Sequence, residues 1–167
     1  FFMIKAVLFD NDGVLIDSES VFFTLTREAL ATAGAELHPS YWARQYLGNG
    51  LKSMKVAESL GLVRSIAGGV IEARNRRFMA RLQEGFIPLA GVAETLSVLR
   101  PLVRMALVTG SPRDKLLLAH QETDILALFD CIITSDDCSQ SKPHPAPYRA
   151  AMNQLGIMPG ECLAVED

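Results

Sequence analysis

The chain has 167 residues, of which 49% are hydrophobic and 21% charged, and its formal net charge at pH 7 is -3. These values predict one packed domain, with or without a small insertion, and argue against a disordered protein. The weak negative charge predicts no surface for nucleic acid or for an anionic membrane, and no apolar run approaches the ~20 residues of a membrane span.

The cysteines and the N-terminal segment indicate a cellular location. Cys131, Cys138 and Cys162 show no CxxC spacing, which predicts reduced thiols and neither a disulfide framework nor a zinc site. The N-terminal residues lack the pattern of a signal peptide. We therefore expect a cytoplasmic protein, either a monomer or a weak homo-oligomer.

Four short apolar runs, each followed by polar residues, predict the strands of one sheet. They span residues 4–9, 105–108, 131–133 and 162–165. Helical patterns precede the later three runs, and strands that alternate with helices predict crossover connections and a parallel sheet. The predicted fold class is α/β, with a Rossmann-like parallel sheet as the core.

The stretch between the first two predicted strands is far longer than the ~10–15 residues of one crossover helix. Apolar residues recur at helical spacing over 21–30 and over 54–60, where Gly61 is a candidate C-cap. Residues 71–82 predict a longer helix. We expect the arginines between 74 and 81 to lie on a solvated helix face, with an anionic substrate as their alternative partner.

These patterns divide the chain into two predicted domains. Residues 1–16 and 87–167 are expected to form the Rossmann-like core, and residues 17–86 an inserted all-helical cap. The chain stops at Glu166 and Asp167, directly after an apolar strand. Because a parallel sheet is normally covered by a helix at that point, we expect the C-terminal part of the core to be missing from this sequence.

Two carboxylates, Asp10 and Asp12, follow the first predicted strand. The i, i+2 spacing places both side chains on one side of an extended backbone, at the strand end where ligands bind in open α/β sheets. Adjacent carboxylates repel each other, and a hard cation such as Mg²⁺ relieves that repulsion. An ordinary polar turn is the alternative, since Asn, Asp and Gly all favour turns.

Thr109 and Ser111 follow the second predicted strand. Ser111 is predicted to cap the next helix, with Pro112 at the first helical position and Asp114 as a capping partner. Free N–H groups at a helix N-terminus bind phosphate, so this motif predicts either a phosphate contact or an ordinary capped helix. The contact is the better interpretation for Thr109, which precedes the cap.

Lys142 and the pair Glu166–Asp167 complete the set. Pro143 favours extended backbone at Lys142, and an ammonium group held in this way can neutralise phosphoryl oxygens and a nucleophilic carboxylate together. A solvated loop lysine is the alternative. Since all four motifs follow predicted parallel strands, their side chains are expected to converge on one edge of the sheet.

The ordered motifs DxDGV, a Thr that ends an apolar strand, KPxP, and an apolar run followed by ED resemble those of the haloacid dehalogenase superfamily. The helical insertion and the sequence Asp17-Ser18-Glu19 resemble its phosphoglucomutase-like and phosphoglycolate phosphatase-like branch. Family members continue past the fourth motif with another strand and helix, which also implies a truncated C-terminus here.

The resemblance implies catalytic roles for four residues. Asp10 would be the nucleophile that forms an aspartyl-phosphate, and Asp12 the general acid and base. Thr109 and Lys142 would contact the phosphoryl group. Substrate contacts are expected for a further set, which is Asn11, Gly48, Lys52, Gly110 and Ser111.

The resemblance also implies Mg²⁺ as the cofactor. Its ligands would be a carboxylate oxygen of Asp10, the backbone carbonyl of Asp12 and the side chain of Asp167, with Glu166 nearby. True dehalogenases lack the acid at the position of Asp12, so its presence favours phosphate esters as substrates.

The implied activity is a Mg²⁺-dependent phosphatase that acts on a small phosphorylated metabolite, such as a sugar phosphate. A phosphosugar mutase is the alternative. The mutases carry a histidine where this chain has Phe22 and a basic loop where it has Leu47–Leu51, although Lys52 could partly substitute. A non-catalytic binding module is a third hypothesis, which rests only on the early C-terminus.

Overall fold

The computed structural model describes residues 3–167, so residues 1 and 2 of the predicted core lie outside the described part of the chain. The chain divides into two compact units. The α/β unit combines the N-terminal residues up to Ser18 with Leu82–Asp167, and the helical unit is Glu19–Arg81. The two boundaries between these units both fall inside residues 17–86, the predicted insertion. Each unit has a hydrophobic core of its own.

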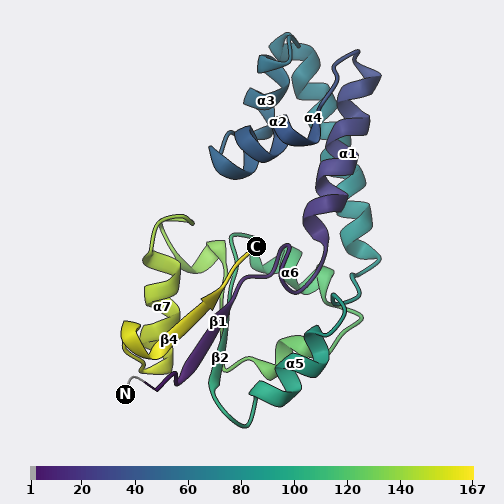
Figure 1. Cartoon of the computed structure of the whole chain (residues 1–167). Coiled ribbons are helices and arrows are strands. Elements are labelled where there is room, and N and C mark those ends of the chain that lie inside the picture. The colour runs from purple at the N-terminus through teal and green to yellow at the C-terminus, as the bar shows by residue number, and fades with distance from the viewer. Residues whose placement is uncertain (1–2) are drawn as a thin grey trace. The chain divides into compact units, whose positions relative to one another are not determined.

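The α/β unit is built on a four-stranded parallel sheet, as the sequence predicts. Its strands are β1 (Ala6–Phe9), β2 (Arg104–Val108), β3 (Cys131–Ile133) and β4 (Cys162–Val165). The order across the sheet is β3-β2-β1-β4, so β1 is central and pairs with both β2 and β4 (Figure 1).

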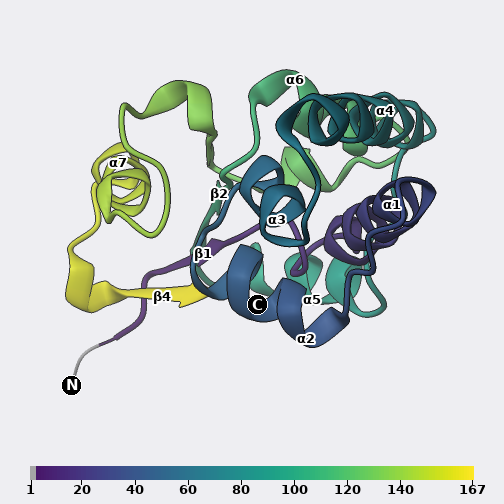
Figure 2. The same cartoon turned by 90° about the horizontal axis from the view of Figure 1, so that it is seen from above.

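Helices cover both faces of this sheet (Figures 1 and 2). Val7 and Phe9 of β1 belong to the cluster formed with α5 (Val92–Leu99) and α6 (Arg113–Ala119), whereas Ala6 and Leu8 belong to the cluster formed with α7 (Ala146–Leu155). Leu163 of β4 is 53% exposed, because β4 lies at the edge of the described sheet. The helices of this unit are α5 (Val92–Leu99), α6 (Arg113–Ala119), α7 (Ala146–Leu155) and the 3₁₀ turns η2 (Ile125–Leu128), η3 (Ser135–Asp137) and η4 (Pro159–Glu161).

The helical unit packs around an aromatic cluster. The rings of Trp42 and Tyr46 stack at 3.9 Å between centroids, and Phe22 contacts both of them and Phe78. The elements of this part of the chain are α1 (Ser18–Thr32), α2 (Pro39–Trp42), the π-helical turn η1 (Ala43–Gly48), α3 (Ser53–Ser59) and α4 (Arg64–Gln83). No helix in the described residues combines the length and apolar character that a membrane crossing requires.

The expected solvated arginine face on α4 is wrong for Arg74. This residue is only 2% exposed, its Nη1 donates to Thr26 Oγ1 at 2.8 Å, and its guanidinium carbon lies 4.0 Å from the ring centroid of Phe22. Arg77 does lie on an exposed face, where it pairs with Glu28 at 2.7 Å. Arginine composition alone therefore did not distinguish the buried cation from the solvated ones.

Candidate active site

The polar residues that follow the strands meet at one edge of the sheet. The main-chain N–H of Asp10 donates to Val165 at the end of β4, and that of Thr109 donates to Ile133 at the end of β3. Since parallel strands all present their carboxyl ends at the same edge, residues distant in sequence become neighbours there.

Asp10 is paired with Lys142. The residue is 9% exposed, and its Oδ1 lies 2.8 Å from Lys142 Nζ, which is also 3.0 Å from Glu166 Oε1 at the end of β4. Burial raises the pKa of Asp10 to about 6, although the Lys142 ammonium and the main-chain N–H of Asn11 both act to lower it. Asp10 is therefore mainly a carboxylate at neutral pH, and it becomes protonated as the pH falls through about 6.

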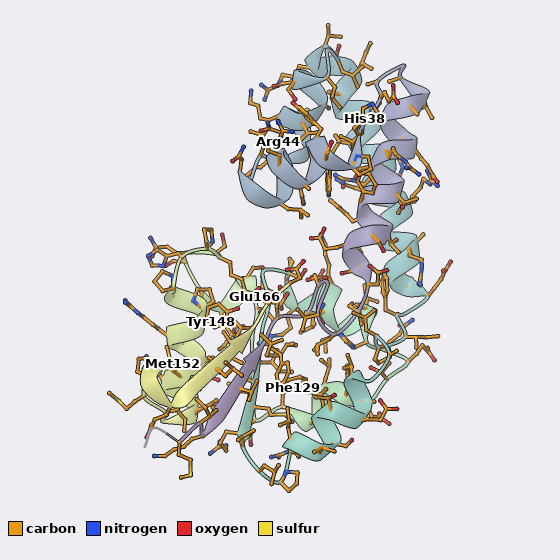
Figure 3. The ribbon with its side chains drawn as sticks, in the orientation of Figure 1. His38, Arg44, Phe129, Tyr148, Met152 and Glu166 are labelled. Atoms are coloured by element: carbon orange, nitrogen blue, oxygen red, sulfur yellow. The ribbon has the colours of Figure 1, made fainter. Side chains whose placement is uncertain are left out.

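The lysine is held by the loop that carries it. The Lys142–Pro143 peptide bond is cis, and Lys142 Nζ lies 5.3 Å from the ring centroid of Tyr148 on α7. His144 Nδ1 accepts a hydrogen bond from the Ala146 N–H at 3.2 Å, so this histidine shapes the loop. Figure 3 shows Tyr148 close to Glu166, on the side of the sheet that α7 covers.

Three hydroxyl groups surround the carboxylate of Asp12. Ser18 donates to Oδ1, and Thr109 and Ser111 donate to Oδ2 at 3.3 and 3.1 Å. The main-chain N–H of Ser111 in turn donates to Thr109 Oγ1 at 3.0 Å. The prediction that Ser111 caps a helix is wrong, because α6 has Pro112 as its N-cap and the serine hydroxyl is used on Asp12.

Asp10, Glu166 and Asp167 form a candidate metal site. Each offers a carboxylate oxygen, and these atoms lie within 4.8 Å of one another. Gly13 makes room for the group, since its φ is +82° and a Cβ there would lie 2.7 Å from Asp167 Oδ2. A set of hard oxygen donors with this concentration of negative charge fits a divalent cation such as Mg²⁺.

The expected substrate contacts remain predictions. Asn11 is only 1% exposed and its Oδ1 lies 2.7 Å from His120 Nε2, so its side chain is turned into the protein and only its main chain is left for a substrate contact. Gly110 is exposed beside Ser111. Gly48 and Lys52 belong to the helical unit, and their substrate contacts remain predictions.

Sequence reasoning missed the residues that support this site. Ser18 was noted only as part of a family signature, and Gly13, His120 and Tyr148 received no role. His120 contacts Asn11 and Gly13 approaches Asp167, which are distant in the chain, whereas Ser18 and Tyr148 lie six residues from Asp12 and Lys142. Motif spacing reveals neither kind of contact. The φ of Gly13 is the one feature with a local signal, because glycine after two aspartates indicates a turn.

Comparisons with known proteins identify the family of the chain. The family model for haloacid dehalogenase-like hydrolases matches residues 4–167. Protein CbbY of Rhodobacter capsulatus is 30% identical over 98% of this chain and 77% of its own length, and the validoxylamine A 7'-phosphate phosphatase of Streptomyces hygroscopicus subsp. limoneus is 32% identical over 99% and 78%. The crystal structure of CbbY from Rhodobacter sphaeroides in complex with phosphate has a TM-score of 0.68, with 25% identity over 99% of this chain and 78% of that one.

Proposed function

Because the chain belongs to the family of haloacid dehalogenase-like hydrolases, we propose that it is a Mg²⁺-dependent phosphatase of a small phosphorylated metabolite, a sugar phosphate or a similar compound. The observation that carries the proposal is the buried carboxylate of Asp10, paired with Lys142 at 2.8 Å beside two further carboxylates. A relative named as a phosphatase of a phosphate ester supports the same reaction class.

Asp10 is the nucleophile of the proposed reaction. Its carboxylate oxygen attacks phosphorus, the new Asp10–phosphorus bond forms, and the bond between phosphorus and the ester oxygen breaks. Lys142 contacts the nucleophile and offsets the negative charge of the phosphoryl oxygens that approach it. An ion pair already formed before substrate binding needs little rearrangement during the reaction.

Asp12 is the general acid and general base of the proposed reaction. It donates one to the leaving oxygen and then accepts one from the water that attacks the aspartyl-phosphate, which releases inorganic phosphate and restores Asp10. The hydroxyls of Ser18, Thr109 and Ser111 fix both oxygens of Asp12 in direction. Thr109 also lies at the strand end where it would contact the phosphoryl group.

Asp10, Glu166, Asp167 and the backbone carbonyl of Asp12 are the groups that would hold Mg²⁺. When bound, the cation neutralises the clustered carboxylates and the charge of the transferring group. The close approach of Asp167 to Gly13 supports this assignment, because it fixes the carboxylate over the loop that carries the nucleophile.

We assign the role of a cap to the helical insertion, predicted from sequence at residues 17–86. A cap excludes water from the site during transfer, and Gly48 and Lys52 are its candidate substrate contacts. Hydrolysis is favoured over mutase activity because Phe22, at the position of the expected mutase histidine, packs its ring against Trp42 and Phe78 in the aromatic cluster.

The test is phosphate release from a panel of phosphorylated metabolites, with and without Mg²⁺, for wild type and Asp10→Asn. We expect metal-dependent release that falls by on the order of 10³-fold or more in Asp10→Asn, because the nucleophile is lost. Asp124→Asn, at an exposed position of the same unit, is the matched control and should retain activity. Undiminished release by Asp10→Asn would refute the assignment, and NMR detection of an isomeric phosphosugar without free phosphate would identify a mutase.

A further inference from the structure

His120 follows the C-terminal end of α6 and is almost fully buried. It is 2% exposed, with Nε2 at 2.7 Å from Asn11 Oδ1 and Nδ1 at 3.3 Å from the Thr123 hydroxyl. Asn11 is the residue between the two aspartates of the first motif, and it is 1% exposed. His120 and Asn11 therefore form a buried polar pair next to the candidate nucleophile in sequence, and the proposed reaction assigns no step to either side chain.

The chemistry of the contact fixes the proton on the imidazole. An amide oxygen only accepts, so Nε2 must carry the proton and donate it to Asn11 Oδ1, which leaves Nδ1 as an acceptor facing Thr123. Burial lowers the pKa of His120 to about 4, so the ring is neutral at physiological pH and keeps this tautomer.

Asn11 connects this bond to the nucleophile loop. Its peptide is joined directly to Asp10, and its main-chain N–H acts to lower the pKa of the Asp10 carboxyl. Its carbonyl oxygen accepts the N–H groups of Leu15 at 2.8 Å and Ile16 at 3.2 Å, which closes the loop that follows β1. Rotation of the Asn11 peptide would therefore move the nucleophile and open the loop together.

We propose that His120 is a positioning residue for the nucleophile, and that its hydrogen bond to Asn11 fixes the peptide that orients Asp10. The proposal rests on the function proposed above. Small displacements of a reacting group are costly, since about 1 Å of misplacement lowers a rate by on the order of 10²-fold. A lost His120–Asn11 bond should therefore lower kcat, while the groups that bind substrate are left in place.

The first test is a double-mutant cycle on turnover of p-nitrophenyl phosphate in saturating Mg²⁺, with His120→Leu, Asn11→Leu and the double variant. We expect each single change to lower kcat roughly 10- to 100-fold with KM changed less than about threefold, and the double variant to lose no more than the worse single one. His120→Gln, whose amide nitrogen can donate in the place of Nε2, should restore kcat to within about fivefold of wild type. Leu155→Ala, a core change against the opposite sheet face, should lower stability without lowering kcat.

The second test does not depend on turnover. Amide hydrogen exchange at Leu15 and Ile16 should be at least about tenfold faster in His120→Leu than in wild type, with α7 amides unchanged. Multiplicative losses in the cycle, or unchanged exchange at these two amides, would overturn the proposal. Wild-type protein that releases no phosphate would count against the proposed function, and the exchange measurement would then decide the role of His120 by itself.

Discussion

The burial of His120 makes the stability of the protein depend on pH. Its pKa is lowered from 6.5 to about 4 in the folded state, chiefly by burial and against the opposing charge of Asp12. Between these two values the unfolded chain binds a proton that the folded chain does not bind. The free energy of unfolding should therefore fall as pH is lowered through this window, and the loss is complete below about pH 4.

The size of the effect follows from the size of the shift. One pKa unit corresponds to about 1.4 kcal/mol, so a decrease of roughly 2.5 units removes about 3 kcal/mol of stability between pH 7 and pH 4. The steepest change is about 1.4 kcal/mol per pH unit, near pH 5. A loss of this size is a large fraction of the 5–15 kcal/mol typical of a folded domain.

The measurement is urea unfolding of wild type and His120→Gln from pH 7 to pH 4, with EDTA present so that the carboxylates stay free of metal. Asp10 acts with the opposite sign, because its raised pKa near 6 makes the folded state bind a proton first. This contribution is common to both proteins and cancels in their difference. We expect the difference in unfolding free energy between wild type and variant to shift by about 3 kcal/mol over the range.

The outcome that would refute this reasoning is a difference that stays constant within about 0.5 kcal/mol from pH 7 to pH 4, since it would mean that the folded protein accepts a proton on His120 at no cost. His38→Gln is the matched control. His38 is exposed in the helical unit (Figure 3), where its Nε2 lies 3.3 Å from Glu36 Oε1.

Two further predictions use pairs of variants that differ in one feature. Gly13 and Gly34 have φ values of +82° and +79°, so alanine at either position should cost about 1–2 kcal/mol of stability. Only Gly13→Ala brings a Cβ against Asp167. Only this variant should therefore weaken Mg²⁺ binding, measured by calorimetry, by about tenfold or more. Equal Mg²⁺ affinities would contradict the metal site. Arg74→Ala should lower stability to urea by about 2–4 kcal/mol, because it removes a buried side chain with its hydrogen bond and ring contact, whereas exposed Arg77→Ala should cost less than about 1 kcal/mol; similar costs would contradict the packing described for α4.

The parallel sheet was predictable because each strand is a short apolar run that ends in polar residues. The bounds of β3 and β4 agree with the predicted runs, and β2 begins one residue earlier, at Arg104. Helix α4 begins at Arg64, well before the predicted start at residue 71, because Gly68 and Gly69 weaken the local helical signal while packing of Ala67 and Val70 in the helical core maintains the helix.

The candidate site was predictable to the extent that its residues follow strands. Asp10, Asp12 and Thr109 could be placed at a sheet edge by topology alone, since parallel strands share their carboxyl ends. The direction in which each side chain points was harder to predict. Asn11 lies one position from each aspartate and so faces the opposite way, toward His120, and the serine at 111 offered two hydrogen-bonding partners between which sequence could not choose.

The central position of β1 has a consequence for the order in which the parts of the protein fold. β1 precedes the other three described strands in the chain, yet Ala6 pairs with Arg104 and with Cys162, both far downstream. Because distant pairings require large loops to close, sheet assembly should be the slow event of folding, and the helical unit, with its local contacts, should form earlier. Recovery of catalytic activity after dilution from denaturant would accordingly mark a late stage of folding, when the four described strands have paired.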